Sequence, residues 1–320
     1  MMHKCQKGED AALKIYEYTP GLCLGDKTVI ALGFFDGVHE GHKRLLAAAK
    51  RAAEEKELTF AVFTFRTVCG VKGKTVIYSD EEKLTLFREL GVEAVILADF
   101  ADISGISADS FIKDCLFHDM GCRVAVCGYD FRFGKGRVGD AKLLFDTLRS
   151  HGAECIIEDE HKLYGEKIST TKIKELLEAG DVGEARLFLG YPYFMLASVE
   201  HGRGVGQKLG FPTVNTTLSP ERAPLRRGVY RTAVSISGKL YTGVTNVGTC
   251  PTFEERAVHA ETYIVGYSGD LYGEKIRIFF LGFLRDEKKF STPEELIMQI
   301  NVDKNKAIKE NGDLTWQAIL

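Results

Sequence analysis

Two histidines stand three residues apart near the start of this chain, in the stretch "GFFDGVHEGH". Imidazoles can donate hydrogen bonds to phosphate oxygens, and Gly33 and Gly37 let the backbone approach a ligand closely. The helix expected directly after them would point its free N–H groups and the positive end of its dipole toward the same place. His39 and His42 therefore predict a cradle for a polyphosphate. The stretch is neither a GxGxxG dinucleotide loop nor a GxxxxGK[ST] phosphate loop.

Two later segments carry further groups that suit nucleotide phosphates. The first is "GYDFRFGKGRVGD" (residues 128–140), which follows a predicted strand and carries three basic residues, Arg137 among them, between glycines. The second is "ISTTKIKELLEAGDV" (168–182), where hydroxyls and a cation at the start of an expected helix suit the β- and γ-phosphates. The alternative interpretation of the second segment is an N-cap followed by a solvated lysine. Its candidate residues are Ser169, Thr170, Thr171 and Lys174.

Strands that alternate with helices are expected to position these three segments. Because the strands are apolar throughout, the pattern predicts a parallel sheet covered on both faces, with ligands beyond the carboxyl ends of its strands. Ser79 and Glu82 form a capping-box pattern at one helix start. The predicted strands are residues 28–34, 58–65, 92–100, 123–131 and 153–159. The predicted helices are residues 41–56, 79–90, 109–120, 140–152, 169–180 and 181–190.

The pattern changes after Tyr191 and Pro192. Short β-rich stretches separated by glycine-bearing turns predict a small antiparallel barrel, and a helix at residues 292–310 is expected to pack on it. The expected fold class is therefore α/β plus β. A Rossmann-like nucleotidyltransferase domain with a parallel sheet would occupy residues 1–188, and a small antiparallel β-barrel with a closing helix would occupy residues 189–320.

The composition is that of an ordinary soluble globular protein and suggests neither a nucleic-acid nor a membrane partner. The chain is 45% hydrophobic and 27% charged, with a net charge of −3 at pH 7. No apolar run approaches the roughly 18–20 residues that span a bilayer, and the N-terminal stretch lacks the apolar core of a secretory signal. The eight cysteines form no CxxC pair, which favours reduced thiols in a cytoplasmic protein.

The three phosphate-binding segments, in this order, resemble the bacterial bifunctional riboflavin kinase/FMN adenylyltransferase (FAD synthetase) family. The family patterns are G-x-F-D-G-x-H-x-G-H, then G-x-[DN]-F-x-F-G-x-x-R-x-G, then I-S-S-T-x-I-R. The second half agrees independently, because "VEHGRGVGQKLGFPTVN" (199–215) resembles the kinase segment V-x-H-G-x-x-x-G-x-x-L-G-F-P-T-x-N. "TGVTNVGTCPTF" (242–253) follows in the family's order, and the resemblance covers residues 13–308.

The resemblance implies two successive reactions. The C-terminal barrel, which is riboflavin kinase-like, would move the γ-phosphate of ATP to the 5′-hydroxyl of riboflavin and so make FMN. The N-terminal domain would then transfer the AMP of a second ATP to FMN, which makes FAD and releases pyrophosphate. The expected substrates are therefore ATP, riboflavin and FMN, with Mg²⁺ as the metal.

In the N-terminal domain, the resemblance implies that His39 and His42 bind the ATP phosphates and stabilise charge on the adenylyl group. The other ATP-binding residues that it implies there are Gly33, Phe34, Asp36, Gly37, Asp130, Arg137, Ser169, Thr170, Thr171 and Lys174.

In the barrel, the resemblance implies that Thr213 and Asn215 hold Mg²⁺ with the ATP phosphates. Two neutral oxygen ligands suit a magnesium ion that keeps waters and takes phosphate oxygens. Glu261 is the implied general base, a role that contributes about 10²–10⁴ in rate. The glycines implied as a flap over the nucleotide are Gly202, Gly204 and Gly206.

The chain departs from the family at three places. The family's T-F-x-P-H-P stretch reads "TFRTVC" at residues 64–69, the second serine of I-S-S-T is Thr170, and the arginine of T-x-I-R is Lys174. Lysine keeps the charge of arginine but loses its bidentate fork. One alternative function is therefore riboflavin kinase alone, with a degenerate adenylyltransferase domain. A non-catalytic flavin-binding sensor is another, and retention of all three implied barrel residues speaks against it.

Overall fold

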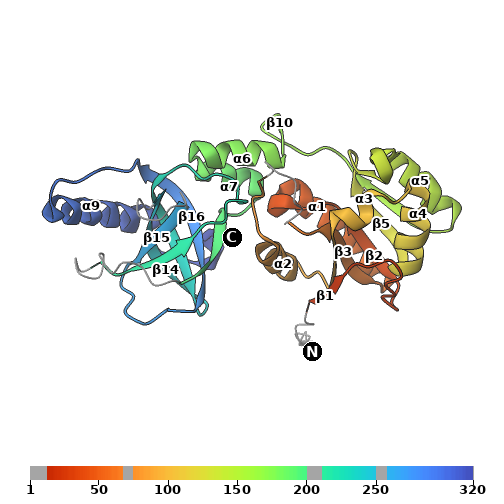
Figure 1. The fold of residues 1–320 in the computed structure, drawn as a ribbon, viewed down its shortest axis with the longest axis horizontal. Coiled ribbons are helices and arrows are strands. Elements are labelled where there is room, and N and C mark those ends of the chain that lie inside the picture. Colours follow the sequence, from red (N-terminus) through yellow and green to blue (C-terminus); the bar gives the residue numbers. More distant parts are fainter. Residues whose placement is uncertain (1–12, 68–74, 200–210, 250–257, 320) are drawn as a thin grey trace, which may run out of the picture. The chain divides into compact units, whose positions relative to one another are not determined.

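The protein is described here from a computed structural model, which covers residues 13–67, 75–199, 211–249 and 258–319 (Figure 1). The chain divides into two compact units. The first unit holds residues 1–72 and 79–167, and the second holds residues 73–78 and 168–320. No helix in the described part of the chain combines the length and the apolar character needed to cross a membrane.

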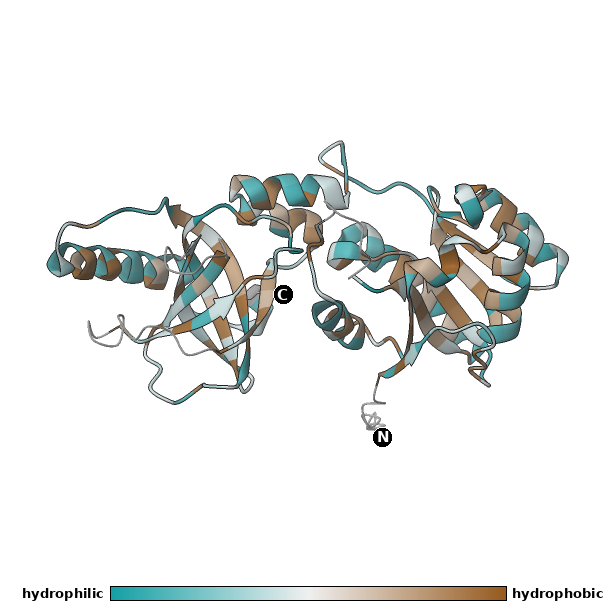
Figure 2. Ribbon diagram, in the orientation of Figure 1, coloured by the Kyte–Doolittle hydropathy of each residue, from teal (hydrophilic) through white to brown (hydrophobic). Residues whose placement is uncertain are grey.

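A six-stranded parallel sheet forms the centre of the first unit, in the order β1-β4-β3-β2-β5-β8. Its central strands are almost wholly buried, as expected for a parallel sheet covered on both faces. Figure 2 shows these strands mostly in the colours of hydrophobic residues. The strands are β1 (Lys14–Glu17), β2 (Thr28–Leu32), β3 (Thr59–Phe65), β4 (Ala94–Ala98), β5 (Cys122–Gly128) and β8 (Glu154–Glu158).

Helices cover both faces of this sheet. α1 (Glu40–Lys56) packs on β2 and β5, and α5 (Ala141–Ser150) packs on β8. Leu144 of α5 belongs to a buried core with Ile30 and Phe63 of the sheet. The remaining helical elements are α2 (Asp80–Glu89), α3 (Phe100–Ser104), α4 (Ala108–Ser110) and the π-helical segment η2 (Phe111–Asp119).

The expected parallel sheet is confirmed, with one strand that the sequence pattern does not predict. β1 presents mostly exposed side chains, so it lacks the apolar run that marks a buried strand. Its backbone nevertheless pairs in parallel with β4. Directly after it, the Tyr18 hydroxyl donates to Oδ2 of the buried Asp119 at 2.9 Å, which fastens this edge of the sheet. The predicted capping box of Ser79 and Glu82 is confirmed at the start of α2.

The second unit is a six-stranded antiparallel sheet in the order β11-β16-β13-β14-β15-β12. The hydroxyl of Thr216 on one end strand donates to the carbonyl of Ser198 on the other at 3.3 Å, so the sheet curls almost into a closed barrel. The expected small barrel is thereby confirmed. The strands are β11 (Phe194–Ser198), β12 (Thr213–Thr217), β13 (Gly228–Ile236), β14 (Lys239–Thr249), β15 (Val258–Ile264) and β16 (Lys275–Arg285).

Three segments outside the barrel strands belong to the second unit. α6 (Thr170–Ala179) and α7 (Val182–Leu189) pack on each other, and α7 packs on β16. Residues 75–78, which lie between β3 and α2 in the chain, are the third. The Val76 amide donates to the Glu221 carbonyl at 2.8 Å, and the ring of Tyr78 stacks on that of Phe194 at 4.8 Å. The chain therefore leaves the first unit after β3 and returns to it at Ser79.

The closing helix α9 (Pro293–Asn311) is held to the barrel by a buried ion pair. Arg285 of β16 donates from Nε and Nη2 to the carboxylate of Asp303, at 3.0 Å and 2.8 Å to Oδ2. Asp303 is 4% exposed and also accepts from Gln299 at 2.9 Å. The predicted helix at residues 292–310 is thus confirmed together with its packing on the barrel.

Removing one partner of this pair should destabilise the second unit strongly. In the Asp303→Ala variant the half-buried Arg285 guanidinium loses its counter-charge, and breaking a buried pair in this way costs about 3–5 kcal/mol. Urea unfolding of the purified chain, followed by far-UV circular dichroism, measures the loss. Asp313→Ala, at an exposed position beyond α9, is the control and should leave the midpoint unchanged. An unaltered midpoint in Asp303→Ala would show that the helix is held by other contacts.

Candidate functional site

The turn after β2 carries the histidine pair and has a strained backbone. Phe35 and Val38 adopt left-handed φ angles of 53° and 36°, and Gly37 adopts 81°. Such angles are costly for residues with a side chain and cluster at functional sites. The turn brings the chain from the buried strand β2 directly to the N-terminus of α1, so the expected strand-to-helix position of the motif is confirmed.

The two imidazoles lie face to face at the start of α1. Their ring centroids are 3.6 Å apart with an interplanar angle of 10°. His39 is the N-cap residue, and its Nδ1 accepts the backbone N–H of His42 at 3.3 Å. Because Nδ1 accepts, the proton of a neutral His39 sits on Nε2, which makes Nε2 a hydrogen-bond donor.

Both histidines are held neutral by their surroundings. Burial lowers the pKa of His39 to about 4, with opposing effects from Asp130 and Lys167. Burial, the charge of His39 and the ammonium of Lys83 lower the pKa of His42 well below its usual value. Part of His42 remains exposed, but its Nδ1 is buried and finds no hydrogen-bond partner among the described residues. At neutral pH the pair therefore offers uncharged N–H donors, not imidazolium cations.

The depressed pKa of His39 makes the stability of the first unit depend on pH. An unfolded histidine titrates near 6.5 and folded His39 near about 4, so the unfolded chain binds more protons between these values. The free energy of unfolding should therefore fall as the pH falls from 6.5 toward 4, by up to ~3 kcal/mol from this residue. Urea midpoints measured from pH 4.5 to 7.5 test this. The slope should be shallower in His39→Asn and unchanged in His151→Asn, at an exposed position; equal slopes in all three proteins would contradict it.

The other expected residues of this turn lie beside the histidines. Gly33 directly follows the strand β2, and a side chain there would meet the ring of Phe35 at 3.1 Å, which favours glycine. Phe34 is 39% exposed, whereas Asp36 is buried. Gly37 is left-handed. The exposed ring of Phe34, the glycine backbone of the turn and the two imidazoles therefore lie together at the carboxyl end of β2. Open parallel sheets bind ligands at this end of their strands.

The second glycine-rich segment forms a small hairpin, β6 (Arg132–Phe133) with β7 (Gly139–Asp140), around the short turn η3 (Lys135–Arg137). Asp130, just before it, faces Lys167 with 3.3 Å between Oδ2 and Nζ. Both charges act on His39, which places them near the histidine pair. Arg137 is exposed, and its side chain makes no hydrogen bond or ion pair within the described residues, so its expected phosphate contact stays a prediction.

The third segment begins α6 in the second unit. Ser169 is the N-cap and accepts the backbone N–H of Lys172 at 3.3 Å. Thr170 and Thr171 occupy the first turn, and the ammonium of Lys174 donates to the carbonyl of Thr75. The N-cap interpretation of Ser169 is thus confirmed, and phosphate binding by these four residues stays a prediction.

A cavity of about 310 Å³ lies against β12 in the second unit. Thr213 and Asn215, two residues apart on this strand, both line it. The amide nitrogen of Asn215 turns back toward the carbonyl of Thr213 at 3.4 Å, so its amide oxygen is left for a ligand. The opposite wall is the loop between β15 and β16, which includes Tyr267, Asp270 and Tyr272.

Strand register places Glu261 next to Asn215, one of the residues that line this cavity. Asn215 on β12 lies directly opposite Glu261 on β15, which in turn lies opposite Asn246 on β14. Directly paired residues share a face, with Cβ atoms about 4.5–5.5 Å apart. Thr262, the next residue, points the other way and is fully buried within the barrel. Glu261 is therefore an exposed carboxylate on the same face as the two expected magnesium ligands.

Several charged residues near the two candidate sites are not predicted from the sequence. Lys83, Asp80 and Lys167 lie near the histidine turn or the segment beside it, and the loop with Asp270 closes the barrel cavity. A charged residue in a predicted helix or loop is usually taken to be exposed to solvent, so its type alone does not indicate that it belongs to a site. Gly202, Gly204 and Gly206 lie outside the described residues.

Comparison with known proteins assigns a family model to each half of the chain. Residues 24–172 match the model described as FAD synthetase, and residues 189–310 match the model described as riboflavin kinase. The helices α6 and α7 thus lie largely between the two matched ranges.

Two curated relatives match along most of their length. The chain is 36% identical over 298 residues to the bifunctional riboflavin kinase/FMN adenylyltransferase of Bacillus subtilis (strain 168), covering 90% of this chain and 94% of the relative. It is 31% identical over 283 residues to the protein of the same description from Escherichia coli (strain K12), covering 86% and 90%.

A solved structure shares the fold. A crystal structure described as a macrolide-efflux protein from Streptococcus pneumoniae aligns with a TM-score of 0.82 and 27% identity, over 93% of this chain and 99% of that one. The efflux description is given for that protein and is not shared by the curated relatives.

Proposed function

Because the chain belongs to the bifunctional riboflavin kinase/FMN adenylyltransferase family, we propose that each of its two reactions has its own ATP site. The protein is an enzyme of flavin-cofactor biosynthesis that phosphorylates riboflavin to FMN and adenylylates FMN to FAD. We assign adenylylation to residues 1–188 and phosphorylation to residues 189–320. The observation that carries this division is the presence of a histidine cradle in one unit and a Thr/Asn-lined cavity in the other.

In the barrel, the cavity beside β12 receives ATP with its γ-phosphate near Glu261. The oxygens of Thr213 and Asn215 would hold Mg²⁺, and their donor chemistry fits a hard cation that also takes phosphate oxygens. Bound there, the ion would neutralise phosphate charge. Glu261 accepts the proton of the riboflavin 5′-hydroxyl as that oxygen bonds to the γ-phosphorus and the bond to the ADP oxygen breaks. Gly202, Gly204 and Gly206 are proposed to cover the nucleotide.

In the first unit, the histidine cradle binds the phosphates of the second ATP. An FMN phosphate oxygen attacks the α-phosphorus, and pyrophosphate leaves. The N–H groups of His39 and His42 and the free amides at the start of α1 donate to phosphate oxygens as charge develops on them. Because both imidazoles are neutral, they act as preorganised donors that need no proton from solution. The other ATP contacts proposed in this unit are Gly33, Phe34, Asp36, Gly37, Asp130 and Arg137.

Aromatic rings beside the cradle supply a surface for the flavin of FMN. Phe34 and Phe65 stack at 6.5 Å with an interplanar angle of 26°, and Phe100 meets Phe65 at 5.8 Å. Phe34 and Phe100 are 39% and 51% exposed, and exposed apolar side chains that lie together can mark a ligand-binding surface. We call these three rings the aromatic face. It supports adenylylation of FMN even though the prolines of the family stretch are missing at residues 64–69.

Product analysis tests the proposal. Purified protein incubated with riboflavin, ATP and Mg²⁺ should form FMN and then FAD, separated by chromatography. FMN without FAD, also when FMN itself is added, would select the kinase-only alternative. Flavin that binds without turnover would select a sensor.

The compartment is proposed to be the cytoplasm. The described cysteines are free thiols, and three of them are buried, which suits a reducing compartment.

A further inference from the structure

A buried lysine lies behind the aromatic face and takes no part in the mechanism given above. Lys83 of α2 is 1% exposed, and its Nζ donates to the carbonyl of Phe65 at 2.8 Å. The same ammonium lies 5.2 Å from the ring centroid of Phe34. It therefore contacts two of the three residues of the aromatic face, one through the backbone and one through the ring.

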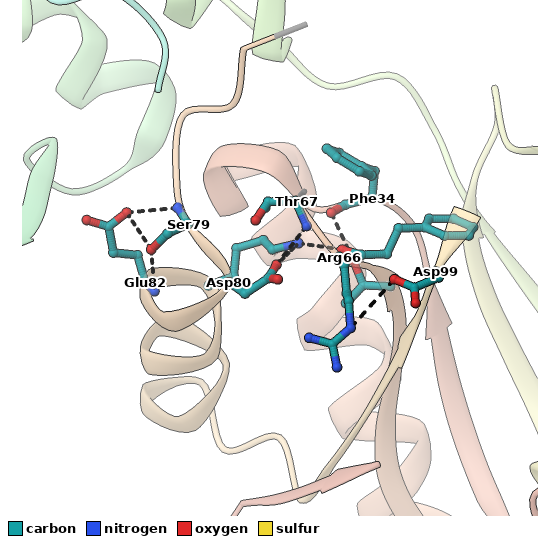
Figure 3. Close-up of polar contacts among 10 residues, drawn as sticks. Phe34, Arg66, Thr67, Ser79, Asp80, Glu82 and Asp99 are labelled. Carbon is teal, nitrogen blue, oxygen red and sulfur yellow. Dashed lines mark hydrogen bonds and ion pairs between the residues drawn. The ribbon is translucent and has the colours of Figure 1, made fainter. Parts of the chain in front are cut away.

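Asp80 completes the arrangement from the first turn of the same helix. Its Oδ1 lies 3.4 Å from Lys83 Nζ and accepts the backbone N–H of Thr67 at 3.0 Å (Figure 3). The pair thus binds a carbonyl and an amide of one short segment, Phe65 to Thr67, which leaves β3 at the carboxyl edge of the sheet. The capping box of Ser79 and Glu82 fixes the helix start that presents both side chains.

Neighbouring contacts hold the rest of this segment, and the ring of Phe65 packs against those of Phe63 and Phe100 at 5.6 Å and 5.8 Å. The Arg66 amide donates to the Ala98 carbonyl at 3.0 Å, and its guanidinium pairs with Glu17. Figure 3 shows the same guanidinium facing Asp99. The Thr64 hydroxyl donates to the carbonyl of Phe34 at 3.0 Å. At this place the chain lacks the two prolines that would stiffen the backbone, so the conformation depends on side-chain contacts.

We propose that Lys83 and Asp80 are positioning residues that hold Phe65 and Phe34 in their stacked arrangement, with 26° between the ring planes, so that the aromatic face is preformed for the flavin ring of FMN. A buried ammonium is costly unless it is paired and hydrogen-bonded, so its placement at this face is specific. The charge of Lys83 also lowers the pKa of His42. The ion pair therefore lies close to the histidine cradle as well as to the aromatic face. This inference rests on the proposed adenylyl-transfer site.

Variant kinetics on the full chain test the inference. Lys83→Met keeps the length of the side chain and removes its charge, and Asp80→Asn weakens the pair while leaving an acceptor for Thr67. In both variants the KM for FMN should rise about tenfold while the KM for ATP changes less than about twofold, because the aromatic face is disturbed whereas burial, the largest cause of the lowered His42 pKa, still keeps that imidazole neutral. Lys142→Met, which removes an exposed ammonium from α5, is the matched control and should alter neither constant.

Riboflavin phosphorylation and a double variant distinguish a positioning role of the pair from a general effect on protein stability. Phosphorylation of riboflavin by the same proteins should be unchanged. Lys83→Met/Asp80→Asn should be no worse for the KM of FMN than the poorer single variant, since the two residues act as a unit. If Lys83→Met does not fold, Asp80→Asn decides alone.

Three results would overturn the inference. One is an unchanged KM for FMN in variants of an active wild type, which leaves the proposed function intact. The second is a fall of kcat with both KM values unchanged and a lowered melting temperature, which would show a purely structural pair. The third is a wild-type protein that makes no FAD, which overturns the proposed function as well.

Discussion

Replacing Glu261 by glutamine should abolish FMN formation while added FMN is still converted to FAD. The substitution keeps the size of the side chain and removes the group that accepts the hydroxyl proton, a loss of about 10²–10⁴ in rate. Register pairs Glu261 with Asn215, so the carboxylate lies on the face where the γ-phosphate is proposed to sit. Initial rates of FMN and FAD formation, each measured by chromatography from its own substrate, give the result.

The control for this variant is Glu294→Gln, which changes an exposed carboxylate in the first turn of α9. It should leave both rates unchanged. If Glu261→Gln forms FMN at the normal rate, the general base lies elsewhere. If the two activities fall together, the division of the reactions between two sites is wrong.

Replacing His42 should have the opposite outcome. His42→Asn withdraws the imidazole N–H donor from the phosphate cradle and leaves only a shorter amide, and losing one preorganised donor costs about 10²–10³ in kcat. FAD formation from added FMN should fall by this factor, while phosphorylation of riboflavin continues. Asparagine retains a donor of smaller reach, so His42→Ala should be lower still.

Folding has to be checked in these variants because the ring of His42 packs against His39 and Phe35. The melting temperature and the rate of riboflavin phosphorylation report it. His151→Ala, at an exposed position at the end of α5, is the matched control. Normal FAD formation by a folded His42→Ala protein would remove the histidine pair from the mechanism.

Local patterns predict much of the fold because they depend on neighbouring residues. Apolar strands, helix caps such as Ser79 and the left-handed turn glycines are each read from a few adjacent positions. β1 escapes prediction because an exposed edge strand has no apolar pattern. The predicted helix at residues 109–120 begins as a short α-helical turn and continues as a π-helix, a difference of hydrogen-bond register that residue type does not encode.

The sites are predictable only where a motif is contiguous. His39 and His42 lie together because one turn of chain joins them. The proximity of Asn215 and Glu261 depends on strand register, which brings together residues far apart in sequence. In the sequence nothing distinguishes Lys83 from the other lysines. Only the structure shows that its side chain is buried inside the first unit. Long-range register and burial are therefore what the structure adds.

The most direct test of the account is a crystal soaked with a non-hydrolysable ATP analogue and Mg²⁺. We predict nucleotide in two places on each chain, against the histidine pair at the start of α1 and in the cavity lined by Thr213 and Asn215. Nucleotide in only one of these places, with the other closed by side chains, would contradict the claim that each reaction has its own ATP site.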